Sequence, residues 1–349
     1  MNPRSCLWLS LSFLCLGAIG ACSATAGESA GDLRTSGQKY LATLTSEQKA
    51  KGVLPYDTPQ RVGWHFIPKE HRKGLQIKDM NPEQRAAALL LLRDALSQLG
   101  YDKTTKIMSL EAILRELEKS RRGGAVRDPE RYYFTVFGNP SANGRWGLSV
   151  EGHHVSLNFV AEGRRLVAST PTFLGSNPTV VQHDVPGAPP KGTRVLGREE
   201  SLAFELLQLL AADQRRVAIL SDKAPRDVRN PESAQSPPYA AEGLCFAKMT
   251  KDQQQKLWEL IAEYAKNMPE AEEHRRLHEI EQAGYDRVYF CWAGADRPGV
   301  GHSYRVQGQT FLIEFVNNQP DAAGNPASNI HSVWRDPRGD FAMSAAHRH

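Results

Sequence analysis

Apolar residues recur at helical spacing in several stretches of the chain and alternate with polar residues in others. Residues 81–99 keep the helical period, with Asn81 placed as an N-cap and Pro82 in the first turn. The same patterns predict helices at 108–120, 198–221, 249–266 and 270–283, and strands at 132–137, 145–150, 153–160, 165–169, 287–292, 302–306, 309–316 and 329–336. Helices and strands that come in separate runs indicate an α+β fold.

The pattern of the first half of the chain returns in the second half. Residues 80–97 and 249–266 share a Met-polar-x-x-Gln opening, and SVEGHHVSLNFV (149–160) matches RVQGQTFLIEFV (305–316) at a constant offset of 156 residues. Each of the latter segments is predicted as a hairpin with a two-residue turn, at Glu151-Gly152 and Gln307-Gly308. We therefore expect two pseudo-repeated helix–helix–antiparallel-sheet units. The alternative is a chance similarity between two segments of helix plus hairpin.

These patterns divide the chain into five parts. They are a signal peptide at 1–21 with a lipobox that ends at Cys22, a tether and N-terminal helix at 22–50, a first α+β half at 51–224, a proline-containing linker or loop at 225–248, and a second α+β half at 249–349.

The N-terminus predicts an exported protein. Arg4 precedes an apolar run from Leu7 to Ile19, which is too short for a membrane-spanning helix and suits a secretion signal. The run ends in Ile-Gly-Ala-Cys, as a bacterial lipobox does, so Cys22 would carry lipid. We expect a periplasmic or outer-membrane lipoprotein that contacts the membrane through its lipid anchor. The alternative is an ordinary signal peptide cut near the same place.

Composition narrows the functional classes. The 349 residues carry a net charge of +4, and the basic residues are scattered, which argues against nucleic acid as a partner. A mean hydropathy of −0.47 excludes a bundle of membrane helices. Beyond Cys22 the cysteines are Cys245 and Cys291, which form either one disulfide or two buried thiols; without CxxC spacing, they exclude a zinc ribbon.

Strand alternation gives each predicted hairpin an apolar and a polar face. The apolar faces hold Trp146, Leu148, Val150, His153, Val155, Leu157 and Phe159 in the first hairpin and His302, Tyr304, Val306, Phe311, Ile313 and Phe315 in the second. The polar faces hold Arg145, Ser149, His154, Ser156 and Asn158, and Arg305, Thr310 and Glu314. In the last predicted strand, Asn329, His331, Val333 and Arg335 share one side. These polar faces are either exposed to solvent or line a ligand site.

Four segments carry a resemblance to a known family. EGHHVSLNF (151–159), TPTFLG (170–175), YRVQGQTFLIEF (304–315) and IHSVWRDPRGDF (330–341) resemble the bacterial family catalogued as domain of unknown function 3500, from about Trp64 to His347. The resemblance implies an exported protein, and it implies no reaction. Relatives commonly have His-x-His before serine where this chain has Asn329-Ile330-His331, so a metal site here would be weaker or would use Asn329.

The first chemical hypothesis is a mononuclear metal site. Imidazole nitrogens suit Zn²⁺, Cu or Fe, and two histidines with one carboxylate leave coordination positions open for water or dioxygen. His154 and His331 are the first candidate ligands and Glu314 the candidate carboxylate, with His153, His302 and His347 as further candidates. Neighbours on a strand point to opposite faces, so we expect only one of His153 and His154 to join a site.

The second hypothesis needs no metal. Arg305, Arg335 and Arg145 would hold an anionic substrate by bidentate contacts, and His154 or His331 would act as general base, oriented by Glu314 or Asp336. The alternative for these arginines is ion pairing with Glu314, Asp336 and Asp340.

The expected function is a metal-dependent hydrolase that acts on a small polar substrate outside the cytoplasm. Its cleft is expected between the two halves, with His154, Glu314, Arg305 and Arg335 as catalytic residues and with Asn158 and Arg145 in substrate binding. The alternative is a non-catalytic periplasmic protein that binds a metal or a small anion.

Overall fold

The structure is a computed structural model, and it describes residues 32–119, 126–236, 238 and 240–344. The expected signal peptide, the lipobox and His347 lie outside these residues. Within the described ranges, no helix combines the length and apolar character needed to cross a membrane.

The described residues form eight α-helices and thirteen strands. The helices are α1 Leu33–Thr43, α2 Ser46–Gly52, α3 Pro82–Ala95, α4 Gln98–Glu118, α5 Gly197–Leu209, α6 Ala212–Ala218, α7 Lys251–Ala265 and α8 Glu270–Ala283. The strands are β1 Val53–Leu54, β2 Leu75–Gln76, β3 Tyr133–Phe137, β4 Arg145–Gly152, β5 Val155–Glu162, β6 Arg165–Ala168, β7 Thr172–Ser176, β8 Ile219–Ser221, β9 Leu244–Cys245, β10 Tyr289–Gly294, β11 His302–Gln307, β12 Leu312–Asn317 and β13 Ile330–Arg335.

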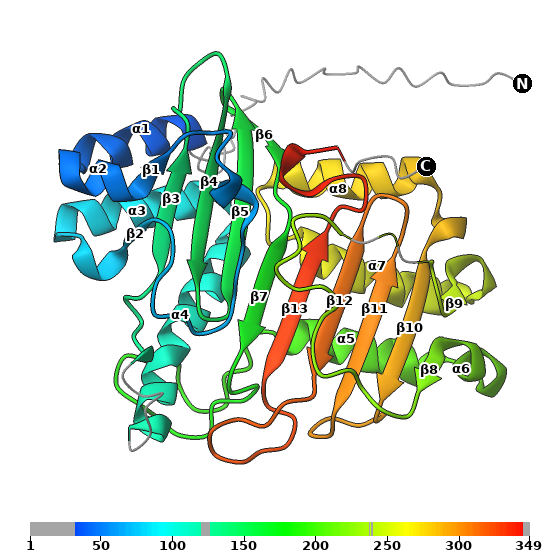
Figure 1. Cartoon of the computed structure of the whole chain (residues 1–349). Coiled ribbons are helices and arrows are strands. Elements are labelled where there is room, and N and C mark those ends of the chain that lie inside the picture. Colours follow the sequence, from blue (N-terminus) through cyan, green and yellow to red (C-terminus); the bar gives the residue numbers. More distant parts are fainter. Residues whose placement is uncertain (1–31, 120–125, 237, 239, 345–349) are drawn as a thin grey trace, which may run out of the picture. The chain divides into compact units, whose positions relative to one another are not determined.

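All these strands belong to one open, mostly antiparallel sheet. Its order is β1-β3-β4-β5-β7-β13-β12-β11-β10-β8, with β2 beside β3, β6 beside β5 and β9 beside β10 (Figure 1). The parallel pairs are β1–β3 and β8–β10, one near each edge. At the centre β7 pairs antiparallel with β13, so strands from the two halves of the chain continue one sheet. The fold is α+β, as the sequence predicts.

The two faces of the sheet are covered differently. On one face, Leu148, Val150, Val306 and Ile313 join the helices in a large apolar core. The second face carries a smaller cluster, made by Phe173, Val316 and Val333 of the sheet with Trp64, Phe66, Val228 and Phe341 of the loops. The polar faces of both hairpins therefore lie under loops, where Ser156, Asn158 and Glu314 are buried. Residues 225–236 of the expected linker form one of these covering loops.

Helix capping explains where the first long helical region breaks. Asn81 Oδ1 accepts from Gln84 N at 2.9 Å and Gln84 Oε1 accepts from Asn81 N at 2.9 Å, which is a capping box at the predicted start. The expected helix 81–99 nevertheless ends at Ala95, because Ser97 caps a new helix by accepting from Gly100 N at 3.0 Å. The prediction that the second helix begins at residue 108 was therefore wrong, because α4 begins at Gln98.

A second expected helix also proved to be several elements. Residues 198–221 form α5, α6 and the edge strand β8, with Leu210 as the C-cap of α5. In the second half, α8 spans the predicted residues 270–283. Cys245 and Cys291 are free thiols, so the disulfide alternative does not apply.

The turns of both hairpins lie two residues later than predicted. In the first, Gly152 pairs with Val155, so His153 and His154 form the turn. In the second, Gly308 N donates to Phe311 O at 3.0 Å across Gln309 and Thr310. The predicted faces of the strands hold, since Leu148 faces Phe159 and Tyr304 faces Phe315. The expectation that His153 and His154 point to opposite faces was wrong, because a turn rather than a strand carries them.

Candidate functional site

The histidine turn meets the start of β13. His154 Nε2 lies 3.2 Å from His331 Nε2, and the two rings meet edge to face. His154 is fixed by its backbone, because its N–H donates to Phe66 O at 2.8 Å and its C=O accepts from Gly175 N at 2.8 Å. Its φ of +62° is left-handed, a conformation that residues other than glycine adopt at a cost.

Gly175 of β7 makes room for the His154 ring. A Cβ atom at this position would lie 2.9 Å from His154 Cγ and Cδ2 and 2.7 Å from Ile330 O. Both distances are shorter than real Cβ contacts, so a side chain here would displace the ring or the backbone of β13. The pairing of His331 with Gly175 across β7 and β13 therefore allows the two imidazoles to approach.

Asp227 orients His331. The carboxylate Oδ1 lies 2.7 Å from His331 Nδ1, so Nδ1 carries the proton and donates it. The other ring nitrogen, Nε2, then faces His154. Asp227 belongs to the loop on the second face of the sheet, and the carboxylate of Glu314 on β12 anchors this loop by accepting from Arg229 N at 3.0 Å and from Arg229 Nε.

His153 extends the group toward the helices. Its ring stacks on His154 with centroids 3.8 Å apart, and its Nδ1 contacts the carboxyl group of Glu111 on α4. Arg127 Nη1 lies 2.9 Å from the same nitrogen. Burial raises the pKa of Glu111 to about 8, so this group is largely protonated at neutral pH.

Burial also keeps the two histidines of the turn neutral. It lowers the pKa of His154 well below the usual value, and the neighbouring His153 and His331 lower it further. The pKa of His153 is lowered by burial first and then by the charge of Arg127. An interaction with Asn329 acts in the opposite direction and raises the pKa of His154. Neutral imidazoles are the form that binds metals and accepts protons.

The remaining predicted residues do not join this group. Arg145 pairs with Glu162 at 2.5 Å, Arg305 with Glu242 at 2.6 Å, Arg335 with Asp340 at 2.8 Å, and Asn158 Nδ2 with Pro171 O at 3.0 Å. The expected convergence of the three arginines on one anion was therefore wrong, since each has its own carboxylate. Arg335 is a structural residue: it is fully buried beneath Trp64 and also donates to Ser233 O at 2.8 Å.

His302 lies on the other, helix-covered face of the sheet. It is fully buried, with Nε2 3.2 Å from Glu200 Oε1 and Nδ1 2.8 Å from Val300 O. It stacks on Trp292 at 5.6 Å and cannot reach His154, so its place among the ligands of one metal was wrong. Within the described residues, no group of three or more histidine, cysteine, aspartate or glutamate side chains is arranged to hold a metal ion.

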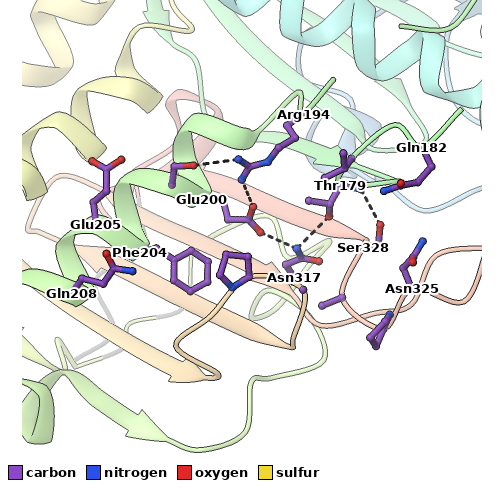
Figure 2. Close-up of a pocket in the computed structure, with 16 residues that line it drawn as sticks. Thr179, Gln182, Arg194, Glu200, Phe204, Glu205, Gln208, Asn317, Asn325 and Ser328 are labelled. Atoms are coloured by element: carbon purple, nitrogen blue, oxygen red, sulfur yellow. Dashed lines mark hydrogen bonds and ion pairs between the residues drawn. The ribbon is translucent and has the colours of Figure 1, made fainter. Parts of the chain in front are cut away.

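Glu200 also lies at the base of a separate pocket of about 420 Å³ (Figure 2). Arg194 Nη2 donates to Glu200 at 2.5 Å, and Asn317 Nδ2 donates to the same carboxylate at 3.0 Å and to Thr179 at 3.2 Å. Burial alone would raise the pKa of Glu200, but its hydrogen bonds with His302, Asn317 and Arg194 hold it below the usual value. These side chains are hydrogen-bonded to one another, so the network is explained by a structural role.

Sequence reasoning missed Asp227, Glu111 and Gly175. The burial of Glu111 could have been predicted from the sequence. Glu111 follows Ile107 by four residues and precedes Leu114 by three, so it lies on the apolar side of a helix. A carboxyl group there must find a partner. Asp227 gave none, since it is one of several charged residues in a proline-containing loop.

The comparisons with known proteins place the chain in one family. It belongs to the family described as protein of unknown function (DUF3500), whose model matches residues 26–343. No curated protein and no solved structure matches the chain.

Proposed function

We propose that the protein binds one divalent transition-metal ion between His154 and His331 and uses it to hydrolyse a small polar substrate. The observation that carries this proposal is the 3.2 Å separation of the two Nε2 atoms. Two nitrogens that each lie about 2.0–2.1 Å from a tetrahedral Zn²⁺ are about 3.3 Å apart. The separation of the two Nε2 atoms is therefore the one that two ligands of a single ion have.

The neighbours of the two histidines favour ligation. The Asp227 carboxylate hydrogen-bonds to Nδ1 of His331, and carboxylate–histidine pairs of this kind are common around metal ligands. The carboxylate also brings negative charge to the site. Burial and the neighbouring histidines lower the pKa of His154, which favours the neutral imidazole that binds metals. Glu314 is then a positioning residue, because it holds the loop that carries Asp227.

Asn329 supplies the third donor in this proposal. Its Oδ1 is buried and has no hydrogen-bond partner among the described residues, and its side chain lies close enough to His154 to affect its pKa. Two nitrogens and one amide oxygen would leave a coordination position for water. A metal ion lowers the pKa of such a water and generates a nucleophile at neutral pH.

Titration of metal-free protein with Zn²⁺ tests the proposal. We expect one equivalent to bind by calorimetry, with His154→Ala and His331→Ala each weakening binding by about 100-fold or more. His278→Ala is the matched control, since this histidine is exposed on α8, and it should bind as the wild type does. Saturating Zn²⁺ that gives no heat, or unchanged binding in both folded site variants, would refute the proposal.

The alternative is a non-catalytic protein that binds a metal. It is favoured by the low exposure of the site, since His154 and His331 expose 3% and 5% of their surface. Cobalt substitution separates the two ideas. A visible spectrum that shifts on addition of small carboxylates or phosphate shows an exchangeable position, as hydrolysis requires, whereas an unchanged spectrum favours the non-catalytic function.

We propose that this activity is located outside the cytoplasm, on a lipid anchor at Cys22. The support is the apolar run from Leu7 to Ile19 and the Ile-Gly-Ala-Cys sequence that ends it. Mass spectrometry of the purified protein should find a diacylglyceryl group on Cys22. A mature protein that begins elsewhere without lipid would contradict the anchor.

We also infer that the two halves are copies of one unit. Gln84 and Gln48 exchange side-chain hydrogen bonds at 2.7 and 3.0 Å, and Gln253 and Gln214 do the same at 2.8 and 2.9 Å. Both Gln84 and Gln253 close capping boxes, and the strand order mirrors itself about β7 and β13. The recurrence of a partly buried amide pair at matching places supports duplication over chance similarity of two amphipathic segments.

A further inference from the structure

A second pocket lies at the opposite end of β7 and β13 from the histidine turn. It has a volume of about 110 Å³, and its wall combines residues from α8, from the segment before β7 and from the segment after β13. The residues that matter here are Arg276 of α8, Ser169 and Thr170 before β7, Thr310 of the second hairpin turn, and Arg338 after β13.

Arg276 is incompletely bonded although it is almost fully buried. Its Nη2 donates to Ser169 O at 2.9 Å and to Ser169 Oγ at 2.6 Å, and its guanidinium lies 4.7 Å from the centre of the Trp334 ring. Within the described residues, its Nε and Nη1 have no hydrogen-bond partner. Buried donors without partners are costly, and those of a charged group most of all.

The charges around Arg276 compensate it poorly. The nearest carboxylate is Glu272, with Oε1 3.6 Å from Nε, and that group also binds the side chain of Arg275 at 2.6 Å. Arg338 brings a further positive charge, which Asp336 and Glu279 neutralise at the rim. Burial lowers the pKa of Arg276 to about 10, so the surroundings oppose its charge.

We infer that this pocket is a binding site for a phosphate or sulfate group, which would accept hydrogen bonds from Arg276 at its base and from Arg338 at its rim. The volume holds several water molecules, as four oxygen atoms require. Thr310 lines the same pocket and its hydroxyl group offers another donor, and hydrogen bonds from a charged guanidinium group to an oxyanion are among the strong ones. The inference does not depend on the proposed metal site, because the two sites share no residue.

Calorimetric titration of metal-free protein with inorganic phosphate, at constant ionic strength set by sodium chloride, tests this inference. We expect one saturable site, weakened at least about tenfold by Arg276→Lys and by Arg338→Gln, because each loses charge-assisted hydrogen bonds. Arg198→Gln is the matched control, since that arginine is half-exposed on α5, and it should bind phosphate as the wild type does.

If Arg276→Lys fails to fold, Thr310→Val tests whether phosphate binds in this pocket. Thr310 is only partly buried, and loss of its hydroxyl group should weaken phosphate binding several-fold while leaving the melting temperature without phosphate unchanged. Phosphate binding that equals the wild type in Arg338→Gln and Thr310→Val would overturn the inference. The absence of saturable binding in the wild-type protein would overturn it as well.

Discussion

Replacing Gly175 by alanine tests the geometry of the histidine site without removing a ligand. The new Cβ would lie 2.9 Å from the His154 ring and 2.7 Å from Ile330 O, whereas ordinary contacts begin at 3.4 Å. The ring would have to move by about 0.5 Å, and the backbone of β13 by about 0.7 Å, to relieve both contacts. The central β7–β13 pairing resists movement of the β13 backbone. We therefore expect the turn that carries His154 to be displaced.

We expect Gly175→Ala to lower the free energy of unfolding by about 1–3 kcal/mol, as overpacking of a filled site does. Displacement of His154 should weaken Zn²⁺ binding by about 10- to 100-fold, the range found when the groups that orient a ligand are lost. Urea unfolding and Zn²⁺ calorimetry measure the two effects.

Gly63→Ala provides the control for this substitution. Its Cβ would meet nothing closer than 3.7 Å, and its φ of −82° suits alanine, so neither stability nor binding should fall. If Gly175→Ala matched the wild type in both assays, the close approach of β7 to His154 would not hold the ligands, and the reasoning would fail.

Three further predictions concern other groups. The pKa of Glu111 is about 8 in the folded protein and 4.5 in the unfolded chain, so its contribution to stability is complete below about pH 4.5 and is lost as the pH rises through 8. Glu111→Gln should therefore flatten the pH dependence of the free energy of unfolding, measured with urea, between these two pH values. An unchanged pH profile would contradict the assignment. Asn329→His adds a third imidazole, so calorimetry should show Zn²⁺ binding at least about tenfold tighter; weaker binding would place Asn329 outside the coordination sphere. Gln84→Ala and Gln253→Ala should each cost about 1–3 kcal/mol in urea unfolding, because each removes the hydrogen bonds of a capping box and of an amide pair. The exposed Gln255→Ala should cost almost nothing.

The sheet faces were predictable because their cause is local. Apolar residues at every second position of 145–160 and 302–316 fix which side of each strand is buried, whatever the strands later pair with. The central strand β7 was not predicted, since its sequence TFLGS is short, lies between Pro171 and Pro178, and shows no alternation. It is buried on both faces and gains its structure by pairing with β5 and β13, which are interactions that no local pattern records.

The candidate site was predictable in residue type and not in geometry. His154 and His331 could be selected because imidazoles on a polar face need partners or a ligand. Their approach depends on the turn position and on the register that sets His331 opposite Gly175, which tertiary pairing determines. Arg305 and Arg335 were selected by the same reasoning and proved to be ion-paired, because chemical type alone does not distinguish a structural charge from a functional one.

The energetic cost of the histidine turn argues that stability does not explain it. His154 adopts a left-handed backbone, which costs a residue other than glycine about 1–2 kcal/mol, and Asn-Gly would form a two-residue turn without that cost. Burial opposes protonation of both histidines, and the adjacent β7 position has to be glycine, which gives up side-chain packing in the middle of the sheet. Strain of this kind persists where the arrangement it produces is used. What it produces here is two imidazole Nε2 atoms 3.2 Å apart, with a carboxylate orienting one of the two rings, and this arrangement supports the proposed ligand site.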